Sequence, residues 1–341
     1  MGKNNEDPIE AGQTWKLDLF RPEDALGVTR LFRLVYGDGY PVKTFTDPEL
    51  LIRENAARRT ISNVARTAKG DIVGHSALYN SAPFPGLYES GSTVVAPNYR
   101  AGVMGFRLVQ YSVRKVAPLF GIEIMFGEGV CNHVTMQKIG IKLNFLPCAL
   151  EVDLMPAEAY TKEESAAGRV AAVLQFDIIT PKPQTIRVPA AYTEMLRFIY
   201  GGIRHECRFV PSAEDLPDGP ETRMESQIFD FAQVARFTVH EAGADFAAVF
   251  AQEENAARQK GTIVHQVFLK LSWPWVGQTV ELLRNRGYFA GGVLPRWLDV
   301  DGFLMQKVFG PPHWDGIQVF GERSAHLLEL VKDDWERSIH P

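Results

Sequence analysis

Apolar and polar residues alternate with a period of two in several short segments of the first half of the chain, and each such segment is predicted to be a strand. Between these segments, apolar residues recur three or four positions apart, which predicts helices instead. The predicted strands are 15–20, 61–67, 72–79, 87–95, 121–129 and 144–154, and the predicted helices are 22–36, 47–58, 106–120 and 132–143. This order predicts an α/β (α+β) fold, a mixed central sheet flanked by helices.

The pattern changes at a polar stretch, 156–167, which is typical of a linker, and then resumes. We expect residues 1–13 to form a disordered tail, 14–155 a first domain and 168–341 a second. The second half predicts strands at 168–179, 224–231, 234–241 and 262–272, a hairpin of 289–294 with 303–309, and helices at 188–201, 244–258, 276–286 and 323–335. Residues 206–223 hold three prolines and many acids, so we expect a surface loop there.

The most informative segment is the junction at residues 94–105, where an apolar strand end meets a Pro-Asn-Tyr-Arg turn and then a helix. Such a turn aims free backbone N–H groups at one point, at the positive end of the helix dipole. A phosphate or pyrophosphate fits this arrangement. Many α/β proteins have the same connection without a ligand, so this turn alone does not establish a site.

The turn resembles the acyl-CoA-binding motif of the GNAT (Gcn5-related N-acetyltransferase) superfamily, whose core is Arg/Gln-x-x-Gly-x-Gly/Ala. Arg100 and Gly105 match its ends, whereas Val103 replaces the first glycine and Gly102 precedes it by one position. Backbone amides hold the pyrophosphate in this family, so Val103 is compatible with binding. The resemblance implies acetyl-CoA, or another acyl-CoA, as co-substrate, bound by Val94, Val95, Arg100, Ala101, Gly102, Val103, Met104, Gly105 and, further on, Asn132.

A second GNAT-like element lies at residues 132–145, which resemble the fourth helix of the family with its closing Gly-Phe. Asn144 takes the place of that glycine, and asparagine also tolerates the left-handed conformation that ends a helix. Gly140 occupies the position where many catalytic members carry a tyrosine as general acid. His133 takes the place where many members have an asparagine that touches the pantetheine arm, and Asn132 precedes it.

The second half resembles a degenerate repeat of the same fold, so the resemblance implies two GNAT copies. Its corresponding turn, residues 240–245, lacks the Arg-x-x-Gly-x-Gly/Ala pattern. Two carboxylates, Glu241 and Asp245, would repel a phosphate there. We therefore expect one cofactor site, in the first half.

Acyl transfer to an amine requires a base, and three residues are candidates for catalysis: Glu89, Glu128 and His133. Glu89 precedes Val95 by six residues, so regular alternation puts it on the same side as Gly91, Thr93 and Val95. The alternative for each acid is an ordinary solvent-facing residue, and the alternative for His133 is a surface or helix-capping residue.

Two tyrosines, Tyr36 and Tyr40, flank a glycine-rich loop that borders the acceptor pocket in GNAT relatives, so we expect them to bind substrate; packing of the loop is the alternative. Cys131 could act as a nucleophile, although a small buried cysteine is the simpler interpretation. No residue spacing suggests a metal site.

The composition of the chain argues against some classes of binding partner. The formal net charge of −5 argues against a nucleic-acid partner, and three cysteines without framework spacing predict a reduced, cytoplasmic chain. No apolar run reaches transmembrane length, so no membrane partner is expected.

Two functions remain. The first is an acyl-CoA-dependent N-acetyltransferase acting on a small amine, and the second is a GNAT-fold protein that binds acyl-CoA or another ligand without turnover. The expected assembly of the enzyme is a homodimer.

Overall fold

The structure is a computed structural model that describes residues 9–37, 40, 42–160, 168–204, 206–219 and 221–339. Contacts divide the chain into two compact units, 1–127 and 128–341. This division falls inside the strand Ile124–Val130. It differs from the boundary expected near residues 155–168, which separates the two proposed copies of the fold. Most of the expected tail, 1–8, and of the expected linker, 161–167, lies outside the described residues.

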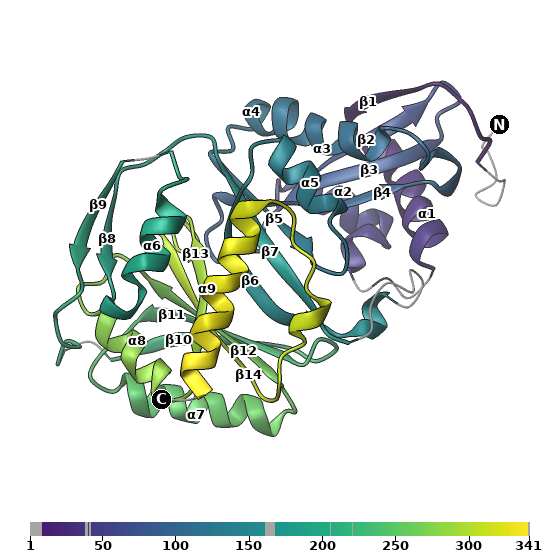
Figure 1. The fold of residues 1–341 in the computed structure, drawn as a ribbon. Coiled ribbons are helices and arrows are strands. Elements are labelled where there is room, and N and C mark those ends of the chain that lie inside the picture. Colours follow the sequence, from purple (N-terminus) through teal and green to yellow (C-terminus); the bar gives the residue numbers. More distant parts are fainter. Residues whose placement is uncertain are drawn as a thin grey trace. The chain divides into compact units, whose positions relative to one another are not determined.

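The first unit is built on a mixed sheet in the order β1-β2-β3-β4-β5 (Figure 1). Its strands are β1 (Trp15–Leu19), β2 (Thr60–Thr67), β3 (Ile72–Tyr79), β4 (Leu87–Val95) and β5 (Ile124–Val130). The pairs from β1 to β4 are antiparallel, whereas β4 and β5 run parallel. The parallel pair requires a crossover, and the helical segment after β4 provides it.

Helices cover both faces of this sheet. One face carries α1 (Ala25–Tyr36) and α2 (Pro48–Ala56), preceded by short 3-10 turns at Pro22–Asp24 and Lys43–Phe45. The Asp47 carboxylate caps α2, accepting hydrogen bonds from the N–H groups of Glu49 and Leu50 at 3.0 and 3.1 Å. The other face carries the crossover, which consists of α3 (Met104–Tyr111), a π-helical turn (Ser112–Val116) and α4 (Ala117–Leu119).

Adjacent residues of β3 show these two faces directly. A Cβ added to Gly74 would lie 2.8 Å from both Leu108 Cδ1 and Met104 Sδ of α3. The next side chain, His75, lies against Phe32 of α1 instead. The alternation predicted from the sequence therefore places α1 and α3 on opposite sides of the sheet.

The second unit has a sheet in the order β7-β6-β13-β14-β12-β11-β10. Its strands are β6 (Leu146–Met155), β7 (Val170–Ile178), β10 (Arg223–Phe229), β11 (Val234–Glu241), β12 (Val264–Lys270), β13 (Phe289–Leu294) and β14 (Gly302–Val308). Within this sheet β11 and β12 pair in parallel, and α7 (Phe246–Gln259) connects them. This β-α-β connection parallels that of β4, α3 and β5, so the expectation of a second copy stands as a proposal.

The remaining helices of the second unit are α5 (Thr135–Lys142), α6 (Thr193–Tyr200), α8 (Val276–Arg284) and α9 (Glu322–Ile339), with 3-10 turns at Ala157–Tyr160, Ala190–Tyr192 and Trp314–Gly316. Asn144 follows α5 with φ 72°, as expected for its capping position. The last helix, α9, lies against β6 and β13 (Figure 1).

One prediction about this unit is wrong. Residues 206–223 are not only a loop, because β9 (Cys207–Pro211) lies within them and pairs in parallel with β8 (Gln184–Val188), a strand that the sequence did not predict. The two strands flank α6 as a second β-α-β connection. Both are short and lie among prolines, so no alternation longer than five residues marks them.

Candidate functional site

The turn between β4 and α3 has the geometry expected of an anion site. A 3-10 turn, Pro97–Tyr99, leads into Arg100, whose Nε donates to the backbone oxygen of Val95 at 3.1 Å. This bond folds Arg100 back onto the strand end and fixes the turn.

The first hydrogen bond of α3 runs from the N–H of Arg107 to the oxygen of Val103. The N–H groups of Met104, Gly105 and Phe106 therefore precede it, and no oxygen among the described residues accepts from them. The first turn of α3 also carries no acidic residue. The positive end of the helix is thus available to an anion.

The space over this turn is open, because Gly102 and Gly105 place no side chain in it. A Cβ at Gly102 would meet no atom within 4 Å, and one at Gly105 would meet only Val95 Cγ2 at 3.9 Å. Val103, which replaces the motif glycine, points outward with 58% of its surface exposed.

The strand that leads to this turn contains a β-bulge. The register pairs Ala77 with Gly91 but His75 with Val94, so Ser92 and Thr93 both lie opposite the single residue between them on β3. Ser92 has φ 49°.

The bulge corrects one expectation from the sequence. The Glu89 side chain lies on the α1 face, where it meets Tyr79, its cross-strand partner. Thr93 lies on the other face, where its Oγ1 hydrogen-bonds Ser76 Oγ at 3.0 Å. Glu89 therefore does not share a face with Thr93 and Val95, because one extra residue shifts all later side chains to the opposite face.

Glu89 is held by two hydroxyl groups that the sequence analysis missed. Tyr79 donates to Oε1 and Ser81 donates to Oε2, each at 2.6 Å. Gly91 makes room for this arrangement, since a Cβ there would lie 2.5 Å from the Tyr79 hydroxyl oxygen. The recorded pairing of β4 with β5 ends at Glu89 and Phe126, so this carboxylate marks the point where the parallel ladder stops.

The two expected substrate-binding tyrosines pack together. The rings of Tyr36 and Tyr40 are stacked with centroids 4.7 Å apart, and Phe32 lies 5.0 Å from Tyr40. Burial, with the neighbouring Tyr36, raises the pKa of Tyr40, and a hydrogen bond to Ser92 opposes this shift. Tyr40 therefore stays protonated at neutral pH.

The other expected site residues belong to the second unit. Glu128 lies 3.7 Å from Arg236, which also binds the buried Glu151 at 3.1 Å. Asn132 is 7% exposed. His133 Nδ1 is buried, and no hydrogen-bond partner for it lies within the described parts of the chain. The structure thus assigns Glu128 to an ion-pair network and leaves His133 Nδ1 available.

The space beside Gly140 is already filled. A Cβ there would lie 2.5 Å from Oε1 of Gln175, a buried residue of β7. A larger residue at this position would therefore have to displace the Gln175 amide. Cys131 is buried, and burial raises the pKa of its thiol to about 12, so it is protonated at neutral pH.

The turn before α7 differs from the turn before α3. The N–H of Gly243 donates to Thr222 Oγ1 at 3.0 Å, and the N–H of Ala244 donates to the oxygen of Pro217 at 3.1 Å. The carboxylate of Asp245 accepts from the N–H and the hydroxyl of Thr222. The N–H groups of Gly243 and Ala244 are thus already bound to Thr222 and Pro217 and are not available to a phosphate.

Solved N-acetyltransferases match half of this chain. The N-acetyltransferase from Staphylococcus aureus Mu50 has a TM-score of 0.40 and 11% identity, covering 49% of this chain and 99% of its own. Half of this chain is similar to N-acetyltransferases. The ribosomal-protein-S5-alanine acetyltransferase from Vibrio fischeri has a TM-score of 0.40 and 13% identity over 51% of this chain and 97% of its own.

A third match is YncA from Salmonella typhimurium, described as a putative acetyltransferase, whose structure contains its cofactor acetyl-CoA. Its TM-score is 0.39 and its identity 13%, over 50% of this chain and 96% of its own. The sequence matches no protein-family profile and no curated protein. At these identities and TM-scores, the chemistry has to be read from this chain's own residues.

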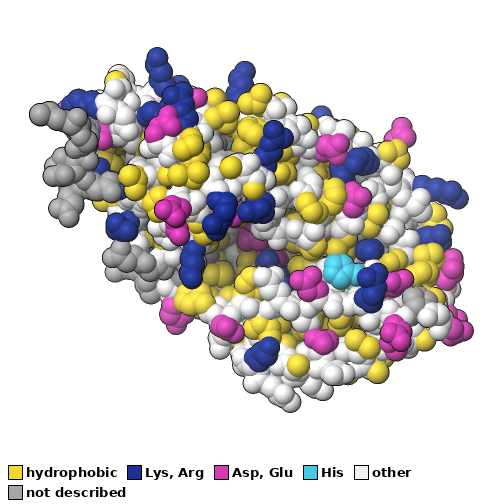
Figure 2. All heavy atoms as spheres, turned by 180° about the vertical axis from the view of Figure 1, so that it is seen from behind, with side chains coloured by type: hydrophobic (Ala, Val, Ile, Leu, Met, Phe, Trp, Pro, Cys, Tyr) yellow, Lys and Arg dark blue, Asp and Glu magenta, His cyan; other side chains and the backbone are white. Residues whose placement is uncertain are grey.

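The residues that the structure describes contain no group of three or more His, Cys, Asp or Glu that could hold a metal ion. None of their helices is both long and apolar enough to cross a membrane. Basic and acidic side chains are interspersed on the face shown in Figure 2.

Proposed function

We propose that this protein binds an acyl-CoA, with acetyl-CoA as the first ligand to test, and transfers its acyl group to a small amine. The observation that carries this proposal is the set of free N–H groups at Met104, Gly105 and Phe106, beneath open space. A pyrophosphate satisfies such donors and gains from the helix dipole. The similarity to N-acetyltransferases agrees with this reading.

The acceptor side of the proposed site is the α1 face of β4. Glu89, oriented by Tyr79 and Ser81, accepts a proton from the amine directly or through a water. The amine nitrogen then attacks the thioester carbonyl, the carbon–sulfur bond breaks, and coenzyme A leaves as the thiolate. A thiolate does not require an acid, because a thiol pKa is near 8.5. Gln175 beside Gly140 is therefore compatible with transfer.

Glu128, Asn132 and His133 remain proposed members of the site, Glu128 and His133 for proton transfer and Asn132 for the cofactor. The Tyr36 and Tyr40 pair is proposed to border the amine. We also propose a homodimer and a cytoplasmic location. The second candidate function is acyl-CoA binding without turnover. It is favoured by Gly140, because a glycine beside Gln175 stands where many catalytic GNAT members carry a tyrosine as general acid.

Isothermal titration with acetyl-CoA tests the proposal. Gly105→Glu places a carboxylate over the free amides and should abolish binding. Gly219→Glu is the matched control, because its Cβ would meet no atom within 4 Å, so the site is as open as that of Gly105, and the charge change is identical. Equal affinities of the two variants would refute the site. Thiol release from acetyl-CoA over a panel of amines then separates transfer from binding alone.

A further inference from the structure

The bulge in β4 places a serine in a backbone conformation that needs support. Ser92 has φ 49°, in the left-handed region that non-glycine residues adopt at a cost in free energy. Such a conformation persists only where the surrounding structure holds it. The contacts of Ser92 therefore identify what keeps β4 bulged.

Tyr40 hydrogen-bonds the Ser92 side chain, and the Ser92 backbone is supported by His75 of β3. Its Nδ1 lies 2.9 Å from the backbone oxygen of Ser92, and its Nε2 lies 3.0 Å from Ser62 Oγ. A carbonyl oxygen can only accept, so Nδ1 carries the proton and Nε2 accepts from the Ser62 hydroxyl. Burial lowers the pKa of His75 to about 4, so the ring is neutral at physiological pH and this tautomer is retained.

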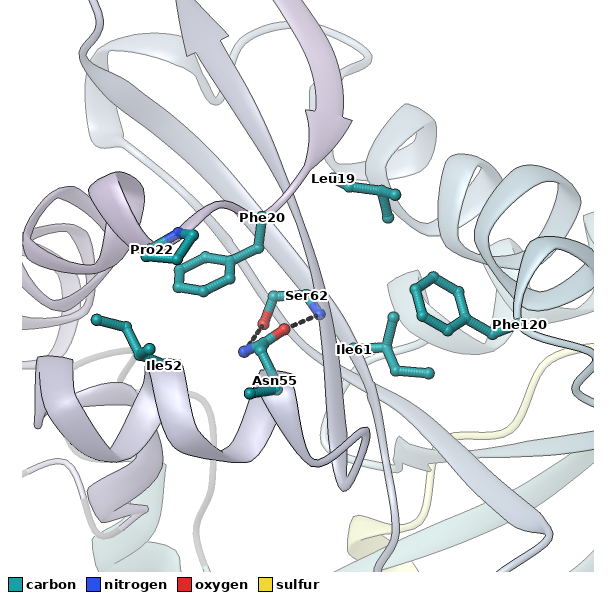
Figure 3. Close-up of a pocket in the computed structure, with 9 residues that line it drawn as sticks. Leu19, Phe20, Pro22, Ile52, Asn55, Ile61, Ser62 and Phe120 are labelled. Atoms are coloured by element: carbon teal, nitrogen blue, oxygen red, sulfur yellow. Dashed lines mark hydrogen bonds between the residues drawn. The ribbon is translucent and has the colours of Figure 1, made fainter.

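Ser62, which lies at the Nε2 side of His75, is also held in place by hydrogen bonds. Asn55 of α2 donates from Nδ2 to Ser62 Oγ at 3.3 Å and accepts from the Ser62 N–H at 2.8 Å, as Figure 3 shows. The Ser62 hydroxyl proton is therefore directed toward His75. Phe32 and Phe45 meet the imidazole edge-on, with centroids 5.3 and 5.2 Å away, and hold its plane.

The bulge also determines where the proposed anion turn lies. Val95 follows it, and its backbone oxygen accepts from Arg100 Nε. Its Cγ2 is the atom closest to the open side of Gly105. Without the extra residue, Val95 would turn to the other face and this anchor would be lost.

We propose that His75 is a positioning residue which, by donating from Nδ1 to the Ser92 carbonyl, pins the β4 bulge and so aligns the Arg100–Gly105 turn for its ligand. The consequence for binding rests on the proposed function, whereas the hydrogen bond and its tautomer do not. The alternative is that His75 only fills the core between β3, α1 and α2.

Two conservative substitutions separate these roles. In His75→Asn the terminal amide reaches the place of Nδ1 and can still donate to Ser92, but the bond to Ser62 is lost. In His75→Gln the amide reaches the place of Nε2 and keeps Ser62, but the bond to Ser92 is lost. Each variant leaves one buried group unpaired, so both should lower the melting temperature by similar amounts.

Binding of acetyl-CoA by isothermal titration should distinguish the pair. We expect His75→Gln to raise Kd on the order of tenfold, the value of one lost hydrogen bond, and His75→Asn to raise it clearly less. Equal Kd values at equal stability would overturn the positioning role.

Nuclear magnetic resonance of the unliganded wild type gives a test that does not need binding. Long-range proton–nitrogen correlations should show His75 as the neutral Nδ1–H tautomer, and the Ser92 carbonyl carbon should shift in His75→Gln more than in His75→Asn. An Nε2–H tautomer would overturn the proposal even if acetyl-CoA binds. If the wild type binds no acetyl-CoA while these spectra agree, the proposed function fails and the pinned bulge stands.

Discussion

Replacing Glu89 with glutamine removes a carboxylate while keeping its shape, and the structure lets the cost to folding be separated from the cost to catalysis. Glutamine Oε1 can still accept from Tyr79, and Nε2 can donate to the Ser81 oxygen where the carboxylate accepted from it. Ser81 is exposed, so water accepts the hydroxyl proton that Glu89 had bound. The free energy of unfolding should therefore fall by only about 1 kcal/mol.

Loss of a general base should instead lower kcat/KM by a factor on the order of 10²–10⁴ at neutral pH. The loss should shrink at high pH, where the unprotonated amine is abundant. The assay is thiol release from acetyl-CoA, measured between pH 6 and 10 at roughly equal saturation with the amine. Tyr79→Phe is the control, because it removes one donor to Glu89 yet keeps the carboxylate. Wild-type rates for Glu89→Gln at every pH would exclude Glu89 and move attention to Glu128 and His133.

Three further predictions concern stability. Gly140→Ala should lower the free energy of unfolding in urea by at most about 2 kcal/mol, because its Cβ would lie 2.5 Å from Gln175 Oε1 while alanine is the better helix former, and Gln175→Ala in the same chain should remove the clash. Asp334→Ala should lose about 3–5 kcal/mol, since this buried carboxylate accepts from Tyr192, Arg284 and the Ala290 N–H; an unchanged urea midpoint would contradict this. Burial lowers the pKa values of His75 and His265 to about 4, so the unfolded chain binds more protons between pH 6.5 and 4. Stability should fall over that window by about 2 kcal/mol per histidine at pH 5, and His75→Asn should reduce the slope.

The sequence predicted the parts of this fold that local patterns encode. Alternation located β1 to β7, the Asp47-Pro48 pair located the start of α2, and Asn144 was correctly expected to end α5 in a left-handed conformation. The free amides in the first turn of α3 follow from the same logic, because the first turn of any helix leaves its N–H groups unpaired.

What the sequence could not show depends on pairing between strands. Gly91-Ser92-Thr93 carries no signal for a bulge, because a period of two does not reveal one inserted residue. Tyr79 and His75 appear as ordinary strand residues until β3 is placed beside β4, which brings one to Glu89 and the other to Ser92. Gln175 likewise meets Gly140 only through the packing of α5 on β7.

The pairing of β6 has a consequence for how the chain could be divided. β6 lies between β7 on one side and β13 on the other, and its inner residues are buried along nearly the whole strand. Gly292 of β13 approaches so closely that a Cβ there would lie 2.3 Å from the oxygen of Cys148. A chain cut after β7 would therefore expose an apolar strand edge able to pair with other chains, so the half that carries the proposed site should aggregate when expressed alone.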